Sequence, residues 1–269
     1  MYFEVNGKRV FATTGGKPFD SSKPSVIFLH GSGLDHRFWG PHARFFAFRH
    51  YAVLAPDLPG HSHSEGPPLT SIESMADWLN DVVETLDIKN ISIVAHSQGC
   101  LVALEFTSRY PDRIRSVSFI ASGLRTPVNP ALIEAAENHP EDAVEMMISW
   151  SFGAAGHLRQ GPIPEYSTQA GARKVIRDNI PAALATDLKA CDKYRNGQQA
   201  ATKITVPTQV ILGGKDRMAP RKAGLELARH LNAPDVQIIE QSGHMLPLEV
   251  PDDCRRLLES FIVSNNPSR

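Results

Sequence analysis

The sequence of 269 residues is poor in cysteine, and this shortage limits the kinds of site it can form. Its three cysteines, Cys100, Cys191 and Cys254, are odd in number and far apart. No paired spacing therefore predicts a zinc site or a disulfide framework. Sparse, unpaired cysteines are typical of a reducing compartment, so we expect a cytoplasmic protein.

The sequence also lacks an excess of charge and long apolar runs. Its formal net charge is -1, with Lys and Arg scattered along the chain, which disfavours binding to nucleic acid or to an anionic membrane surface. Nowhere do about 18 apolar residues follow one another, and residues 1–8 include an acid but no apolar segment of signal length. We expect a soluble protein with neither nucleic acid nor membrane as a partner, and the oligomeric state stays open.

What the sequence does contain is a repeated alternation of short apolar runs and amphipathic segments. Residues 72–86 repeat apolar side chains at helical spacing, and Asn6-Gly7 predicts a tight hairpin between residues 2–5 and 9–13. Alternation of strand and helix predicts an α/β fold with a mostly parallel central sheet of about eight strands flanked by helices. The runs that we expect to form buried strands are residues 25–29, 52–55, 91–95, 116–121, 208–212 and 236–239.

The alternation is interrupted between residues 125 and 201, where prolines separate helix-like pieces. We interpret residues 125–201 as an inserted helical cap, and residues 1–124 and 202–269 as the core. Residues 252–261 are amphipathic and predict a final helix that begins near Pro251.

Ser97 lies in Ala95-His96-Ser97-Gln98-Gly99, where an apolar strand runs directly into a helix. A sharp turn at this junction lifts the hydroxyl clear of the sheet, at a backbone strain of roughly 1–3 kcal/mol. Small residues two positions away, here Ala95 and Gly99, let the strand and the helix approach each other. We predict that Ser97 is a nucleophile, although such a pentapeptide also occurs by chance.

A glycine-rich loop, His30-Gly31-Ser32-Gly33, follows the strand at residues 25–29. Acyl transfer places negative charge on a carbonyl oxygen, and two convergent backbone N–H groups stabilise it by several kcal/mol. We predict that the N–H groups of Ser32 and Gln98 form this oxyanion hole. An ordinary turn is the alternative interpretation of the loop by itself.

A base and an acid follow two late strands, in Gly213-Gly214-Lys215-Asp216 and in Ser242-Gly243-His244. Loops beyond the carboxyl ends of parallel strands converge, so Ser97, Asp216 and His244 are expected to meet. Each residue alone has a structural explanation: Asp216 as a helix cap, and His244 as a histidine bonded to backbone. Their order and their strand context together predict a catalytic triad.

These segments, together with Ala55-Pro56-Asp57-Leu58-Pro59-Gly60-His61-Ser62, resemble the α/β-hydrolase fold superfamily over nearly the whole chain. The resemblance implies a serine hydrolase without cofactor or metal. The histidines near residue 61 belong to a loop of the family pattern, so we expect no metal site there. One departure is Ala95, where the family more often has glycine.

The serine at the elbow argues against the family members that use aspartate there, the dehalogenases and epoxide hydrolases. We expect a carboxylesterase that cleaves small to medium esters through an acyl-enzyme. Lactonases, thioesterases and C–C hydrolases of ring-fission products remain alternatives. A ring-fission hydrolase needs polar groups for a dienoate carboxylate, and Arg125, Arg159 or Arg173 could serve. A small-molecule receptor that retained the pocket is the non-enzymatic alternative. The residues expected to line the pocket are Gly31, Gly33, Phe38, Trp39, Met146, Met147, Trp150, Phe152, Met218, Met245 and Leu246.

Overall fold

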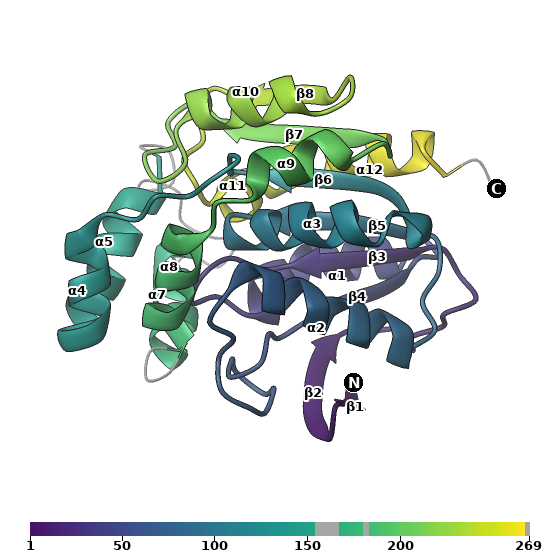
Figure 1. Cartoon of the computed structure of the whole chain (residues 1–269), viewed down its shortest axis with the longest axis horizontal. Helices are drawn as coiled ribbons and strands as arrows, with labels where there is room; N and C mark the ends of the chain where they lie inside the picture. The colour runs from purple at the N-terminus through teal and green to yellow at the C-terminus, as the bar shows by residue number, and fades with distance from the viewer. Residues whose placement is uncertain (154–166, 180–182, 267–269) are drawn as a thin grey trace.

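The computed structural model describes residues 1–153, 167–179 and 183–266 and shows an eight-stranded sheet (Figure 1). Its strand order is β1-β2-β4-β3-β5-β6-β7-β8. The hairpin β1–β2 and the β2–β4 pair are antiparallel, and all other neighbours are parallel, which confirms the predicted fold class. The strands are β1 (Tyr2–Val5), β2 (Lys8–Thr13), β3 (Ser25–Leu29), β4 (Ala52–Pro56), β5 (Ile91–His96), β6 (Ile114–Ile120), β7 (Thr208–Gly213) and β8 (Asp235–Ile239).

Helices cover both faces of the sheet (Figure 1). One face carries α2 (Ile72–Thr85), α3 (Gln98–Arg109), α9 (Gly197–Lys203) and α10 (Arg221–His230). The opposite face carries α1 (Gly40–Ala47), the short α11 (Leu246–Glu249) and α12 (Pro251–Ser264). Local signals fix the helix starts: the Ser71 side chain accepts a hydrogen bond from Ser74 N before α2, and Pro251 opens α12.

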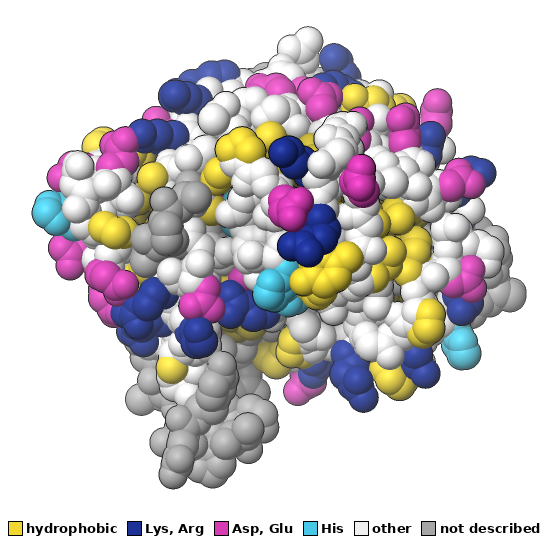
Figure 2. Space-filling model, turned by 90° about the horizontal axis from the view of Figure 1, so that it is seen from below, with side chains coloured by type: hydrophobic (Ala, Val, Ile, Leu, Met, Phe, Trp, Pro, Cys, Tyr) yellow, Lys and Arg dark blue, Asp and Glu magenta, His cyan; other side chains and the backbone are white. Residues whose placement is uncertain are grey.

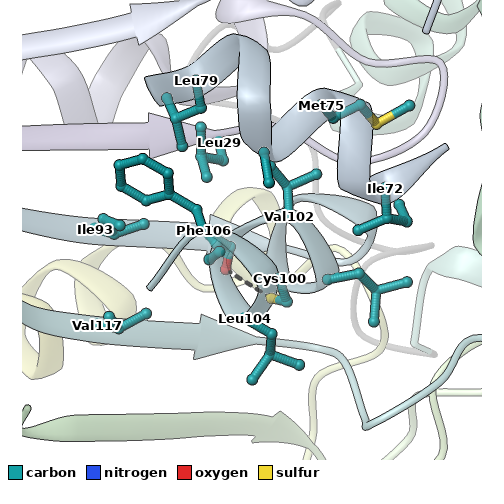
Figure 3. Packing of buried hydrophobic residues seen from close by; sticks show 14 of the residues in the cluster. Leu29, Ile72, Met75, Leu79, Ile93, Cys100, Val102, Leu104, Phe106 and Val117 are labelled. Carbon is teal, nitrogen blue, oxygen red and sulfur yellow. Dashed lines mark hydrogen bonds between the residues drawn. The ribbon is translucent and has the colours of Figure 1, made fainter. Parts of the chain in front are cut away.

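The layer between the sheet, α2 and α3 is a dense apolar core (Figure 3). Met75 and Leu79 of α2 lie beside Val102 and Phe106 of α3, all at most 1% exposed. Burying side chains of this size stabilises the fold by roughly 1.5–3 kcal/mol each. Helix α3 is therefore held firmly against the sheet, and so is the turn that joins it to β5.

Strand β8 differs from the other predicted core strands because it lies at the edge of the sheet. Among the described strands it pairs only with β7, and its residues are exposed or half-buried, with Val236 at 36% exposure. The prediction that residues 236–239 form a buried strand was wrong in this respect. An apolar run does not distinguish a central strand from an edge strand that has one neighbour.

The helices between β6 and β7 form a separate group beyond the carboxyl ends of the parallel strands (Figure 1). They are α4 (Pro130–Asn138), α5 (Pro140–Ser151), α7 (Thr168–Asp178) and α8 (Ala183–Lys193). The predicted cap, residues 125–201, contains all four. Helix α9 crosses position 201 and packs against α3, so the cap boundaries stay a prediction.

The surface carries mixed charge. Figure 2 shows acidic and basic side chains interspersed over one face of the molecule. Within the described ranges, no helix combines the length and the apolar composition that a membrane span requires.

Candidate active site

Ser97 occupies a strained turn between β5 and α3. Its φ of 52° and ψ of −119° lie outside the common regions for a residue with a side chain. Gly99 makes the turn possible, because a Cβ atom at this position would lie 2.6 Å from the carbonyl oxygen of Leu29. The methyl group of Ala95 is fully buried within β5, so the residue that departs from the family pattern fits this turn.

Asp216 and His244 are joined by a hydrogen bond of 2.9 Å between Oδ2 and Nδ1. The other oxygen of Asp216 accepts hydrogen bonds from the backbone N–H groups of Met218 and Ala219, at 2.9 and 2.8 Å. Asp216 therefore both shapes its own loop and orients the imidazole. Because Nδ1 carries the hydrogen toward the carboxylate, the neutral ring keeps Nε2 as an acceptor, as a general base requires.

Two residues that the sequence analysis did not identify hold the His244 loop. The backbone N–H of His244 donates to the carbonyl oxygen of Ser151 at the end of α5, at 2.6 Å. The carboxylate of Glu249 accepts from the N–H groups of Gly243, at 3.1 Å, and of Gly153, at 3.0 Å. Burial raises the pKa of Glu249 above its ordinary value. The loop that carries His244 is thus bonded directly to residues at the end of α5.

His96 contacts the other side of the site. Its ring centroid lies 4.9 Å from that of His244, and its Nε2 donates to the His244 carbonyl oxygen at 3.0 Å. Burial, followed by the nearby charge of His244, holds the pKa of His96 well below its ordinary value. His96 is therefore a neutral packing partner of the candidate base.

Ser97 and His244 line one cavity of about 370 Å³, a size that suits a small ligand. The Ser97 hydroxyl makes no hydrogen bond to another described residue, so it faces the cavity free to react. The position of Ser97 at the end of β5 and of His244 after β8 follows the predicted convergence at the carboxyl edge of the sheet.

The predicted oxyanion donors lie beside this serine. Ser32 lines the cavity, and Gln98 is the first residue of α3. Neither backbone N–H donates to another described residue, so both remain available to a ligand. The Gly33 N–H, in contrast, is already bonded to Asp187 in α8, at 2.8 Å. The free donors are the two that an oxyanion hole needs.

The cavity wall agrees with the predicted pocket at some positions and departs from it at others. Gly31, Met147, Trp150, Met218 and Met245 line the cavity. The predicted residues that do not line it are Gly33, Phe38, Trp39, Met146, Phe152 and Leu246. Phe38, Trp39, Phe152 and Leu246 are at most 3% exposed and pack in the core behind the wall, because large apolar side chains serve packing as readily as binding.

Several wall residues were missed by the sequence analysis. Most belong to the predicted cap and carry no chemical signal, and only the packing of the cap brings these to the site. The cationic Arg217 is different, since it directly follows Asp216 in the sequence. The additional wall residues are Leu34, His96, Thr126, Pro127, Val128, Asn129, Leu132, Leu188, Cys191 and Arg217.

The arginines considered for a dienoate carboxylate do not line the described cavity. Arg173 forms an ion pair with Glu145 at 2.7 Å on the cap surface. Arg125 is exposed, and Arg159 lies outside the described residues.

Asp35, His36 and Asp57 place three potential metal-ligand atoms within 4.8 Å of one another. Their groups are already engaged: Asp35 accepts from Arg37 and Asn179, and Asp57 accepts from the His36 ring and backbone. Saturated carboxylates of this kind order loops, and we assign no metal to them.

The buried cysteines are unreactive thiols. Burial raises the pKa of Cys100, Cys191 and Cys254 to about 12. Cys100 packs in α3 against β5, as expected for a structural residue.

Comparison with known proteins places this site in context. A family described as "Alpha/beta hydrolase family" matches residues 26–257. The chain is 25% identical to Protein ABHD8 of Bos taurus over 88% of its own length, but it covers only 56% of that relative. It thus spans about half the length of the first curated relatives it matches.

Two other similar proteins match along nearly their full length. The pimeloyl-[acyl-carrier protein] methyl ester esterase of Neisseria meningitidis is 29% identical, with 91% of this chain and 96% of that protein covered. The solved structure of a thermophilic esterase is 26% identical, with a TM-score of 0.80 and coverage of 99% of this chain and 98% of that chain.

Proposed function

Because the chain belongs to the alpha/beta hydrolase family, we propose that it is a serine carboxylesterase that cleaves small to medium carboxylic esters through an acyl-enzyme. One observation carries the proposal: His244, oriented by Asp216 at 2.9 Å, lines the same cavity as the strained and unbonded Ser97. Similarity to two esterases supports the same class of reaction.

Acylation begins when Ser97 Oγ attacks the ester carbonyl carbon while His244 Nε2 takes the hydroxyl proton. Asp216 stabilises the imidazolium through Nδ1. The carbonyl electrons move to oxygen, and the N–H groups of Ser32 and Gln98 stabilise that charge. When the tetrahedral intermediate collapses, the ester C–O bond breaks and His244 returns the proton to the leaving alcohol.

Deacylation repeats these steps with water as the nucleophile. His244 takes a proton from water, the hydroxide forms the second tetrahedral intermediate, and its collapse releases the acid and restores the Ser97 hydroxyl. A lactone reacts in the same way, except that the alcohol stays attached to the acyl group.

The cavity determines which esters fit. Its volume of about 370 Å³ and its methionine, leucine and tryptophan side chains suit a short or aromatic acyl group. Arg217 is the one arginine or lysine among its described wall residues, and no carboxylate is among them. We expect that an ester with an acidic group at its far end is accepted better than a neutral ester of equal size.

Replacement of the nucleophile tests the proposal. Ser97→Ala should lower kcat for p-nitrophenyl butyrate by roughly 10⁴-fold or more, and abolish labelling by a fluorophosphonate. Ser122→Ala is the matched control, because this buried serine follows the next strand and does not line the cavity, and it should keep both properties.

The same measurements separate the proposed enzyme from its alternatives. Steady turnover after the first acylation distinguishes a hydrolase from a receptor that binds one probe per molecule. Turnover of dienoate ring-fission products far above that of esters would contradict the carboxylesterase proposal, as would undiminished labelling of Ser97→Ala.

A further inference from the structure

The oxyanion loop contacts one face of cap helix α8, and Asn179 at the end of α7 donates to the Gly33 carbonyl at 3.3 Å. Oδ2 of Asp187 accepts a hydrogen bond from the Gly33 N–H at 2.8 Å, and Cys191, one turn later, places its sulfur 3.6 Å from the Ser32 hydroxyl oxygen. A side chain at Gly33 would lie 2.8 Å from Leu184 of the same helix, and the φ of Gly33 is +64°. The loop therefore has little freedom to move on this face.

Asp187 also contacts the other half of the oxyanion hole. Its backbone carbonyl accepts a hydrogen bond of 3.4 Å from the side-chain amide of Gln98. One residue of the cap thus touches both segments that supply the free N–H donors beside Ser97. Asp187 is fully buried, so this contact is shielded from water.

A histidine lies within hydrogen-bond distance of the Asp187 side chain. His61 Nε2 lies 2.9 Å from Asp187 Oδ2, and His61 Nδ1 lies 3.1 Å from the carbonyl oxygen of Pro59. Both oxygens act as acceptors, so both ring nitrogens carry hydrogens and His61 is an imidazolium. Burial lowers the pKa of His61, but the charge and hydrogen bond of Asp187 outweigh it, and the pKa is raised.

The desolvation free energy of this buried ion pair makes it a poor means of stabilising the attachment of the cap. Desolvation of two buried charges commonly cancels their attraction, and apolar residues of similar volume often stabilise a fold as well. The second oxygen of Asp187, Oδ1, moreover has no partner among the described residues. Such a pair is better explained by the geometry that it imposes on Gly33 than by stability.

We propose that Asp187 is a positioning residue that sets the geometry of the oxyanion hole. Held by His61, its carboxylate fixes the Gly33 N–H and thereby aims the adjacent Ser32 N–H at the carbonyl oxygen above Ser97. The inference rests on the proposed function, because the donors matter only if Ser97 forms a tetrahedral intermediate. It makes α8 part of the catalytic apparatus as well as a cover for the substrate.

Asp187→Asn tests the inference with a minimal change of shape. The neutral amide oxygen accepts more weakly from Gly33 and no longer balances the charge of His61, so kcat/KM should fall by roughly 10- to 100-fold, mostly in kcat. The affinity of a trifluoromethyl ketone, whose adduct with Ser97 carries the oxyanion, should fall by the same factor. The affinity of the corresponding methyl ketone, which binds largely as a planar carbonyl, should change less than about twofold.

Two further variants keep the test decisive. Asp178→Asn removes a cap-to-core ion pair, with Arg37 at 2.7 Å, in which neither side chain bonds directly to the oxyanion loop, and it should leave both inhibitor affinities within about twofold. His61→Gln should reproduce the direction of the Asp187→Asn effects and replaces that variant if it does not fold. In a double variant the two losses should not add, because the residues act as one unit.

The outcomes distinguish the inference from the proposed function. Normal labelling of wild-type Ser97, together with an unchanged ratio of the two ketone affinities in folded Asp187→Asn or His61→Gln, overturns the positioning role alone. Loss of thermal stability without a change in that ratio also overturns it, since a simple attachment of the cap predicts this result. Absence of wild-type labelling at Ser97 overturns both.

Discussion

Two buried histidine–aspartate pairs lie in different regions of this molecule, and their bonding differs at one nitrogen. His244 and Asp216, in loops after β8 and β7, meet at 2.9 Å, and so do His61 and Asp187, which join the loop after β4 to α8. His61 uses both ring nitrogens, whereas His244 Nε2 makes no hydrogen bond to a described residue. His61 is therefore locked as a cation, and His244 keeps a site for proton exchange.

The comparison shows that a short His–Asp contact does not by itself identify a catalytic base. What distinguishes the pairs is access: His244 lines the cavity and His61 does not. A buried pair with every ring nitrogen bonded holds segments together, and a pair with one nitrogen open to a cavity can transfer protons. Substitutions in the two pairs should therefore affect different steps of the reaction and should lower activity by different factors.

The largest effect is expected from Asp216→Asn. Its amide would donate to His244 Nδ1 and force the hydrogen onto Nε2, so the ring could no longer accept the Ser97 proton. We expect kcat to fall by roughly 10³- to 10⁴-fold for p-nitrophenyl butyrate, with little change in the thermal midpoint, because the amide oxygen still serves Met218 and Ala219.

Asp235→Asn, on the exposed edge strand β8, is the matched control and should keep wild-type turnover. The fall should also exceed that of Asp187→Asn by at least about tenfold, since a misdirected base costs more than a displaced oxyanion donor. Equal losses in the two variants would contradict the distinction between the pairs.

The candidate catalytic pair was predictable from sequence, and the proposed positioning pair was not. Ser97, Asp216 and His244 each follow an apolar strand directly, and parallel strands bring such positions to one edge whatever else the chain does. His61 and Asp187 are 126 residues apart, and their contact depends on how α8 packs on the core. No local pattern encodes that packing.

The errors in the predicted pocket also arise because no local sequence pattern encodes how the cap packs on the core. Phe38 and Trp39 follow the predicted oxyanion loop in the sequence, and Leu246 follows His244, but their size makes them core side chains, and they are at most 2% exposed. Val128, Leu188 and Cys191 line the cavity because the cap helices place them there. The strands themselves were predicted to within two residues at each end, since their apolar runs are local, and only the exposure of β8 escaped.

Another buried histidine, His42 of α1, differs from both pairs because neither ring nitrogen has a partner among the described residues. Burial, followed by the charge of Arg255, lowers its pKa to about 3. The native state therefore excludes a proton that the unfolded chain binds below pH 6.5 or so. Stability is full above this pH and is lost as the pH falls toward 3.

His42→Leu should remove this acid sensitivity. Between pH 8 and pH 5 the free energy of unfolding of the wild type should fall by about 2 kcal/mol more than that of the variant, as urea unfolding at both values would measure. His139→Leu, at an exposed histidine, should show the wild-type pH dependence. Parallel pH curves for wild type and His42→Leu would contradict this prediction, because they would show that the His42 ring binds a proton as readily in the native state as in the unfolded chain.

The smallest effect is expected on the preference for a charged over a neutral ester, which should depend on Arg217 and not on α8. Arg217 lines the cavity next to the Asp216 pair and has no ion-pair partner among the described residues, whereas α8 contributes only the uncharged Leu188 and Cys191 to the wall. Arg217→Gln should lower kcat/KM for p-nitrophenyl hemisuccinate up to about fivefold, because an exposed charge pair is worth roughly 0.2–1 kcal/mol. The rate for neutral p-nitrophenyl butyrate should stay unchanged, and the preference for the hemisuccinate should weaken at high salt.

Two other variants serve as controls for this prediction. Lys215→Gln, at an exposed residue that is absent from the wall, should change kcat/KM for neither ester. Asp187→Asn should slow both esters equally, because an oxyanion forms whatever charge the substrate carries. A fall in both rates for Arg217→Gln would instead place this arginine with the residues that support the reaction itself.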